Sequence, residues 1–321
     1  MGKSMLALNL RGQLSIGLAL MVELVLFSVL SPYFFTPENL LNVSLQVSII
    51  AIIAAGMTFV ILTGGIDLSV GSLVALSGVV TAALLKLSTT PAVSLSVALT
   101  GGLLVGAVSG ACAGFSVTRF KIAPFIVTLA LMTIWRGLAF VYTEGRPVWE
   151  LPEAFALLGG GRIASVPIPS VIMAVVFVCA HVALTRTRFG RYVYAVGGNR
   201  EAARLAGIRT ERVLLQVYVI CGALAALSGI LLASRMNSGQ PNAGVSYELD
   251  VIAAVVVGGT SLSGGRGSVV GTFIGAMLIA VLRNGLNLMN VGSYFQQVIV
   301  GVVILLAVLM DQMRRGPASS T

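Results

Sequence analysis

The sequence is poor in charged residues. Only 10% of its 321 residues are Asp, Glu, Lys or Arg, whereas 57% are hydrophobic, and the mean hydropathy is +1.00. A soluble globular chain carries about a quarter charged residues, and a single core could not bury this much apolar surface. The composition therefore excludes a soluble domain. It predicts an all-α integral membrane protein with one transmembrane domain over residues 1–321.

Histidine and cysteine are scarce as well. The chain has one histidine, His181, and three cysteines, Cys112, Cys179 and Cys221, all within apolar runs. No pair of them has the spacing of metal ligands, and they do not suggest a disulfide framework. No nucleophile has a histidine base in a plausible arrangement. The sequence therefore predicts a protein that is not an enzyme and that uses no metal or cofactor.

Apolar runs long enough to cross a bilayer recur from Leu14 to Met310. A spanning helix needs roughly 20 apolar residues. Ten candidate spans result, at about 14–31, 40–62, 68–86, 92–117, 124–142, 168–185, 213–233, 248–262, 268–288 and 294–311. The eighth is short. The stretch 40–86 also allows a second interpretation, a break within the membrane at Gly64 and Gly65. The first run is long and lacks a small-x-small cleavage site, so we expect it to be retained.

Positive charge is unevenly distributed between the loops. Lys and Arg number 20 against 11 acidic residues, a net charge of +9. If the N-terminus is inside, one inner loop, residues 186–212, holds seven arginines, while most acidic residues fall in outer segments. Cytoplasmic loops are enriched in Lys and Arg. The pattern therefore predicts that both termini are cytoplasmic, and it accounts for the charge without a nucleic-acid partner.

Glycines recur in two ways. Two stripes have a spacing of four residues, which favours close helix packing; they are Gly102, Gly106, Gly110 and Gly114, and Gly267, Gly271 and Gly275. Residues 64–71 also echo residues 258–265, a candidate internal repeat of the kind that lies near transport sites. The glycine-rich run 258–271 is not a phosphate loop, because Gly265 stands where the lysine is needed and no strand precedes it. We expect any ATP hydrolysis to belong to a separate subunit.

The inner loop 186–212 predicts a short surface helix. Asn199 is a good N-cap, Glu201 in the first turn complements the helix dipole, and Gly207 ends the helix. The face between them is small and apolar, with Ala202, Ala203 and Leu205. Such a face suits docking into a groove of another protein. The alternative is a cytoplasmic loop that happens to be helical.

Three segments carry a resemblance to a known family. Glu201-Ala202-Ala203, followed by Gly207-Ile208, is similar to the coupling motif of ABC importer permeases. Residues 56–72, which include Gly64-Gly65-Ile66-Asp67-Leu68-Ser69, resemble a signature of the sugar branch of that family, and residues 247–262 and 280–297 resemble a second.

The resemblance covers nearly the whole chain. It implies a permease subunit that moves a monosaccharide such as ribose across the bacterial inner membrane. It also implies four kinds of partner: a second permease copy in a homodimer, an ATP-binding subunit on the inner loop, a periplasmic sugar-binding protein and the lipid membrane.

Two further sets of residues are candidates for function. Asp67 is a charge between two long apolar runs, and intramembrane charges are usually functional. With Ser69 and Asn287 it either lines the pathway or, as an N-cap, satisfies a helix start. The outer segment 143–167 carries acidic and aromatic groups that either lie at the membrane interface or receive the binding protein; they are Glu144, Trp149, Glu150 and Glu153.

Two alternatives stay open. An amino-acid importer permease of related architecture would share most of these features. An ion-coupled secondary transporter would need intramembrane carboxylates to bind H⁺ or Na⁺, and the spans offer only Glu23 and Asp67.

Overall fold

The computed structural model describes residues 2–87 and 91–314, so both ends of the predicted 1–321 domain lie outside the described residues. The regular elements of the described part are helices, apart from one two-stranded antiparallel sheet. In chain order the elements are α1 (Gly2–Leu30), α2 (Pro37–Leu62), α3 (Val70–Leu87), α4 (Pro91–Arg119), α5 (Pro124–Thr143), α6 (Glu153–Gly160), β1 (Arg162–Ile163), β2 (Val166–Pro167), α7 (Ile168–Arg186), α8 (Arg188–Gly198), α9 (Arg200–Leu205), α10 (Thr210–Met236), α11 (Tyr247–Val257), α12 (Val269–Leu288) and α13 (Ser293–Arg314).

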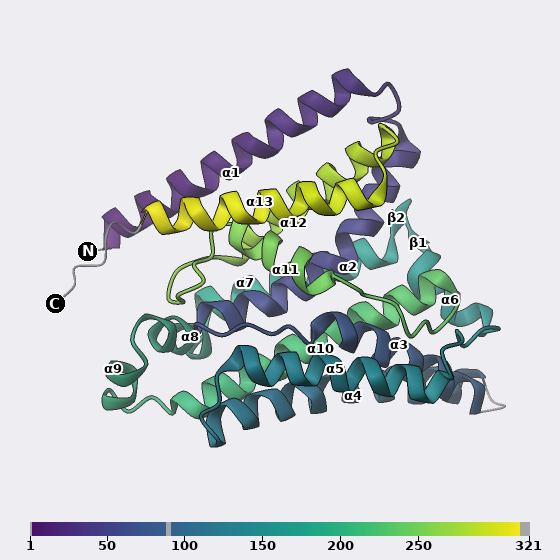
Figure 1. The fold of residues 1–321 in the computed structure, drawn as a ribbon, viewed down its shortest axis with the longest axis horizontal. Coiled ribbons are helices and arrows are strands. Elements are labelled where there is room, and N and C mark those ends of the chain that lie inside the picture. Colours follow the sequence, from purple (N-terminus) through teal and green to yellow (C-terminus); the bar gives the residue numbers. More distant parts are fainter. Residues whose placement is uncertain (1, 88–90, 315–321) are drawn as a thin grey trace.

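The long helices run roughly along one direction (Figure 1). The start of α1 and the end of α13 lie together at the end of the molecule that carries α8 and α9, which we call the α9 end. The sheet β1–β2 and α6 lie at the opposite end, which we call the hairpin end (Figure 1). Both described chain ends therefore lie on the same side as the arginine-rich loop, as the charge pattern predicts.

Within residues 2–87 and 91–314, seven helices are long and apolar enough to cross a membrane: α2, α3, α4, α5, α7, α10 and α12. The described parts of α1 and α13 contain shorter apolar stretches, Ser15–Leu30 and Ser293–Leu306. The predicted span 248–262 is wrong as a single crossing helix. Its helix, α11, has 11 residues, which at about 1.5 Å per residue is roughly half of the ~30 Å hydrocarbon layer.

Burial divides the helices into a core and a periphery. The apolar windows of α2, α3 and α10 are 83%, 72% and 72% buried, whereas those of α4, α5 and α7 are 28%, 17% and 22% buried. All six are similarly apolar, so hydropathy alone could not separate them. The first three form the centre of the bundle, and the other three present apolar faces outward, as helices in contact with lipid do.

The first glycine stripe packs α4 against α10. A Cβ at Gly106 would meet the carbonyl oxygen of Gly222 and the Cβ of Ala226, and one at Gly110 would meet the carbonyl group of Tyr218. The backbones can approach this closely only because both positions lack side chains. The predicted role of this stripe in helix packing is confirmed. Two glycines of the second stripe likewise pack one helix closely on another. Gly271 and Gly275 of α12 contact the backbone of α11 and of its C-cap.

Two connections turn back into the bundle instead of leaving it. Residues 63–69, between α2 and α3, are not helical, and α3 then runs beside α10, with Ser77 Oγ 3.4 Å from the carbonyl oxygen of Ala226. Residues 237–246, after α10, pair with Val148 through Gly239 and then reach Gly71 near the start of α3. The break at Gly64 and Gly65 thus separates two helices.

The two echoed segments lie against each other at the α9 end. The N–H of Gly265 donates to the carbonyl oxygen of Leu62 at 2.8 Å, and a Cβ at Gly264 would lie 2.8 Å from the backbone nitrogen of Gly64. Gly197 in α8 also packs on the carbonyl oxygen of Leu62. The end of α2, the loop before α12 and the end of α8 therefore meet at one point.

Candidate functional site

The structure has two main cavities, one toward each end of the bundle. The α9-end cavity has a volume of about 560 Å³ and lies between α9, the start of α10, the 63–65 segment and the turn between α4 and α5. The hairpin-end cavity has a volume of about 250 Å³ and lies between α2, α10, α11, α12 and α13. A protein with cavities at opposite ends of a helical bundle has the geometry that a transport pathway needs.

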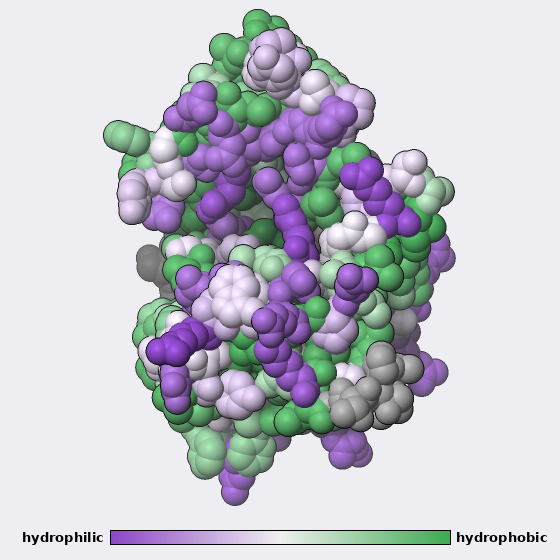
Figure 2. All heavy atoms as spheres, turned by 90° about the vertical axis from the view of Figure 1, so that its right-hand side faces the viewer, coloured by the Kyte–Doolittle hydropathy of each residue, from purple (hydrophilic) through white to green (hydrophobic). Residues whose placement is uncertain are grey.

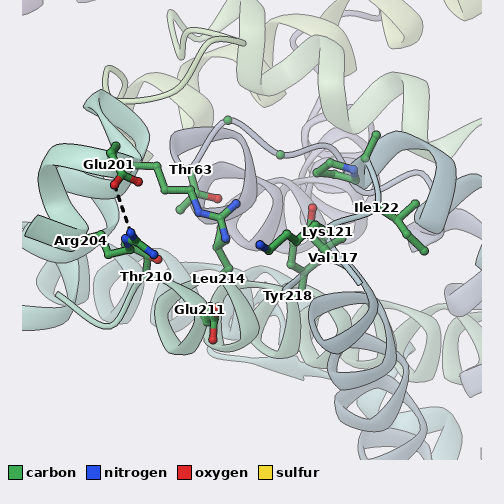
Figure 3. A pocket seen from close by; sticks show the side chains of 15 residues that line it. Thr63, Val117, Lys121, Ile122, Glu201, Arg204, Thr210, Glu211, Leu214 and Tyr218 are labelled. Atoms are coloured by element: carbon green, nitrogen blue, oxygen red, sulfur yellow. Dashed lines mark ion pairs between the residues drawn. The ribbon is translucent and has the colours of Figure 1, made fainter. Parts of the chain in front are cut away.

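Helix α9 forms as the sequence predicts. The side-chain oxygen of Asn199 accepts a hydrogen bond from the backbone N–H of Ala202 at 2.9 Å, which is an N-cap. Gly207 has a φ of 83°, and its N–H donates to the carbonyl oxygen of Arg204. Glu201 lies in the first turn and pairs with Arg204 at 3.3 Å (Figure 3).

The predicted apolar face of α9 is only partly available. Ala203 is buried against the protein, whereas Ala202 is exposed and the side chain of Leu205 is 80% exposed. The face that remains for a partner is thus Ala202 and Leu205, with Glu201 and Arg204 beside them.

Helix α8 was not predicted. It is capped by the Thr187 side chain, which accepts from the N–H of Gly190 at 3.2 Å, and it buries Val193 and Val196. The Tyr194 hydroxyl donates to the carbonyl oxygen of Gly267 at 2.9 Å, and burial raises the pKa of Tyr194, so the hydroxyl keeps its proton. The apolar spacing of Val193 and Val196 after a Thr N-cap is the signal that could have found this helix.

The α9-end cavity is lined by charged groups from separate elements. Lys121 comes from the turn before α5, Glu201 and Arg204 from α9, and Glu211 from the first turn of α10 (Figure 3). Tyr218 lies on the wall of the cavity, with its hydroxyl buried and without a hydrogen-bond partner among the described residues. Charged side chains and the hydroxyl-bearing Tyr218 therefore line this cavity together.

Asp67 and Ser69 lie in the turn that starts α3. Asp67 Oδ1 accepts from the backbone N–H of Ser69 at 2.9 Å and from its hydroxyl at 2.6 Å, and both residues are buried. Asp67 is three residues before the first residue of α3, so it stabilises the preceding turn, as Asp often does, and is not itself the N-cap. The Ser69 carbonyl oxygen accepts the first bond of the helix, from the N–H of Leu73.

Asn287 lies elsewhere, on the wall of the hairpin-end cavity. Its side-chain oxygen accepts from Gln296 Nε2 at 2.7 Å. The structure therefore does not bring the three candidate pathway residues together. It places Asp67 and Ser69 at the start of α3, and Asn287 near the end of α12.

The hairpin-end cavity also contains an ion pair that the sequence analysis missed. Arg283 from α12 donates to Asp250 in the first turn of α11. Asp250 is buried, and the Arg283 side chain is 32% exposed. The sequence signal was an arginine within an apolar run, but nothing in the sequence paired it with Asp250.

The acidic and aromatic residues of the outer segment lie near the hairpin end. Glu144 ends α5 in a left-handed conformation, Trp149 is 55% exposed, and Glu153 begins α6. Glu150 lies 3.9 Å from Lys86 at the end of α3. This end of the molecule presents hydrophilic residues around a hollow, with hydrophobic residues along its flanks (Figure 2). Both predicted roles, interfacial anchor and docking surface, fit this position.

The apolar helices, the two cavities and the exposed helix α9 define a multi-pass helical membrane protein of the permease class. The chain belongs to the family described as branched-chain amino acid transport system / permease component, which matches residues 39–308.

Named relatives narrow the comparison within that family. The chain is 49% identical to the ribose import permease protein of Escherichia coli strain K12, over 93% of each chain. It is 48% identical to the ribose import permease protein of Bacillus subtilis strain 168, over 92% of this chain and 91% of that one. It is 43% identical to the L-arabinose ABC transporter permease protein of Azospirillum brasilense, over 92% and 87%. No solved structure matches.

Proposed function

We propose that this chain is the permease subunit of an ATP-binding-cassette importer that carries a monosaccharide, ribose, across the bacterial inner membrane. The observation that carries the proposal is the 49% identity to a ribose import permease over 93% of both chains. Relatives named for arabinose and allose are less similar, at 43% and 36% identity. All of these relatives are named as permeases, and catalysis of ATP hydrolysis falls to a partner.

The names of the similar proteins favour ribose over an amino acid as the transported substrate, whereas the fold does not distinguish the two. The family description names branched-chain amino acids, so the architecture serves both substrate classes. An ion-coupled mechanism is disfavoured by the relatives, since the Azospirillum brasilense protein is named an ABC transporter permease. Asp67 is held by Ser69 and Asp250 by Arg283, whereas Glu23 has a buried carboxylate oxygen without a hydrogen-bond partner among the described residues. A site for H⁺ or Na⁺ needs a carboxylate free to exchange its partner, so Glu23 is the carboxylate on which the test with an ionophore bears.

Helix α9 is the proposed coupling element, docking into the ATP-binding subunit. Its six contributing residues are Asn199, Glu201, Ala202, Ala203, Leu205 and Gly207. Asn199 and Gly207 hold its ends, Ala203 seats it on the permease, and Leu205 is free to enter a groove. The carbonyl group of Leu62 contacts both α8 and the loop before α12. Movement of α8, which directly precedes α9, would therefore be transmitted to the end of α2 and to that loop.

The arrangement in the membrane follows from the same elements. We propose ten crossings, with residues 237–246 and α11 together forming the eighth, and both termini cytoplasmic. The echoed segments 64–71 and 258–265, which meet where Gly264 packs against Gly64, would form the internal repeat. The α9 end faces the cytoplasm, and the hairpin end faces the periplasm.

Two further partners complete the importer. Glu144, Trp149, Glu150 and Glu153 would contact the periplasmic sugar-binding protein. A second permease copy would form a homodimer, for which the sparsely buried outer faces of α4, α5 and α7 are available. Asp67 and Ser69 would hold the start of α3 beside the pathway, and transport would proceed by alternating access between the two cavities.

Proteoliposomes test the proposal. The permease is reconstituted with its ATP-binding subunit, and the sugar-binding protein is supplied outside with radiolabelled ribose. We expect uptake that requires internal ATP, that excess unlabelled ribose abolishes and that leucine does not. An ionophore that collapses proton and sodium gradients should leave uptake unchanged. Uptake of leucine in place of ribose would establish the amino-acid alternative, and loss of uptake with the ionophore at constant ATP would establish ion coupling.

A further inference from the structure

The hairpin-end cavity is walled by α2 and by the four consecutive helices α10 to α13. α2 contributes Gln46, α10 Arg235, α11 Tyr247 and Asp250, and α12 Arg283 and Asn287. At about 250 Å³ it lies just below the range of about 300–1,000 Å³ that is typical of sites for drug-sized ligands. It therefore has room for one small solute.

The walls combine an apolar floor with convergent polar groups. Ile49, Ala276 and Ile279 supply the apolar part, and the Tyr247 ring supplies an aromatic face with a hydroxyl at its tip. Amide groups from two helices meet at one side, where Gln296 donates to Asn287 at 2.7 Å. An apolar wall with a few fixed polar groups is the usual composition of a small-molecule site.

The charges in the cavity indicate which solutes it accepts. Asp250 and Arg283 neutralise each other, and Arg235 lies in the last turn of α10, where a cation complements the helix dipole. A charged solute that displaced one member of this pair would leave the other unpaired at high cost, and Arg235 would also repel a cation. A neutral solute with several hydroxyl groups can donate to the carboxylate and accept from the guanidinium without separating them.

The resting pair is also incompletely satisfied. Arg283 Nε is buried and has no hydrogen-bond partner among the described residues. A buried donor without a partner is costly, and a pair kept only to join two helices could be replaced by apolar side chains. A hydroxyl group that reached this nitrogen would remove that cost.

We propose that the hairpin-end cavity is a low-affinity site for a neutral polyol, a monosaccharide in transit, in which Asp250 and Arg283 bond its hydroxyl groups and Tyr247 packs against its ring. This rests on the proposed function, because it takes the sugar as the substrate. It adds where in the permease the sugar is held and which side chains hold it.

Protection of a cysteine tests the site. Ile50→Cys places a thiol on the wall of the cavity, in a background where the exposed Cys112 and Cys179 are alanine. The purified permease in nanodiscs is labelled with a small uncharged thiol reagent, with and without ribose. Ribose at three times its dissociation constant should slow labelling about fourfold, since only a quarter of the sites stay empty. Leucine at the same concentration should not slow it.

The matched control is Ile122→Cys in the same background, which places the thiol on the α9-end cavity. Its labelling rate should be unaffected by ribose. Adding Asp250→Asn or Arg283→Gln to Ile50→Cys should abolish protection. Where either variant does not assemble, Tyr247→Leu, which keeps the ion pair, should still weaken protection at least threefold.

Ribose uptake by the complete importer is measured with each variant. Unprotected labelling of Ile50→Cys at high ribose, with ribose uptake intact, would overturn this site and leave the proposed function standing. Equal protection by ribose and leucine would overturn the assignment to a polyol. Protection that persists in Asp250→Asn and Arg283→Gln would show that these side chains do not hold the sugar.

Discussion

Removing the N-cap of α9 should weaken binding of the ATP-binding subunit without disturbing the permease. Asn199→Ala deletes the acceptor for the Ala202 N–H, a bond of 2.9 Å on a helix of six residues. Loss of such a cap costs about 1 kcal/mol, and a helix this short has little else to hold it.

The size of the effect follows from that cost. About 1 kcal/mol corresponds to roughly a fivefold change in an equilibrium constant. If only the ordered helix docks, the apparent dissociation constant rises by up to about fivefold. The permease should keep its thermal stability, because α9 buries only Ala203 among its six residues.

The assay is surface binding of the ATP-binding subunit to permease in nanodiscs, together with ribose uptake. Asn199→Asp is the matched control, since Asp caps as well as Asn, and it should bind within about twofold of the unmodified protein. If Asn199→Ala binds with unchanged affinity, or if the alanine and aspartate variants are equally impaired, the docking role of an ordered α9 is refuted.

Four further outcomes are expected. Glu201→Lys and Gly207→Asp should leave the permease in the membrane but lower uptake at least tenfold, since one reverses a charge at a helix N-terminus and the other strains a residue with φ of 83°; uptake at wild-type rate in both would contradict coupling through α9. Asp67→Asn should retain most uptake, because Asn can also accept from Ser69, whereas Asp67→Leu should lose it; equal activity of the two would contradict the turn-holding role. Gly106→Val should lower the melting temperature in detergent by several degrees or prevent assembly, whereas Gly137→Ala, which has nothing within 4 Å of the added carbon, should not. Calorimetry of permease without its binding protein should find ribose affinity on the millimolar scale, about −4 kcal/mol, and micromolar affinity would place selectivity in the permease.

The predictable part of the fold was local. Runs of apolar residues located the seven described helices that are long and apolar enough to cross a membrane, and the chemistry of Asn199 and Gly207 located both ends of α9. These features depend on residues within a few positions of each other, so one sequence contains all the information. The depth at which a segment lies in the bundle does not depend on nearby residues alone. Residues 248–262 are apolar enough to span, yet the preceding segment enters the bundle and leaves α11 with only 11 residues.

Only those parts of the candidate site that are formed by residues close together in the sequence could be predicted. Asp67 was recognised because it interrupts an apolar run, and the residue that donates to its Oδ1, Ser69, is only two positions away. Asp250 and Arg283 are 33 residues apart and meet through the packing of α11 on α12. Pairings of that kind are set by the tertiary structure, and so the hairpin-end cavity could not be found from composition or spacing.

The junction at Leu62 has a mechanical consequence. Its carbonyl oxygen accepts from Gly265 and lies under Gly197, where not even a methyl group would fit. The end of α2, the end of α8 and the loop before α12 thus pack backbone against backbone, with no side chain between them. Because these backbones are in direct contact, α8 cannot shift without moving the end of α2 and the loop before α12. A displacement of α8 would therefore reach the end of α2 and the loop before α12 together.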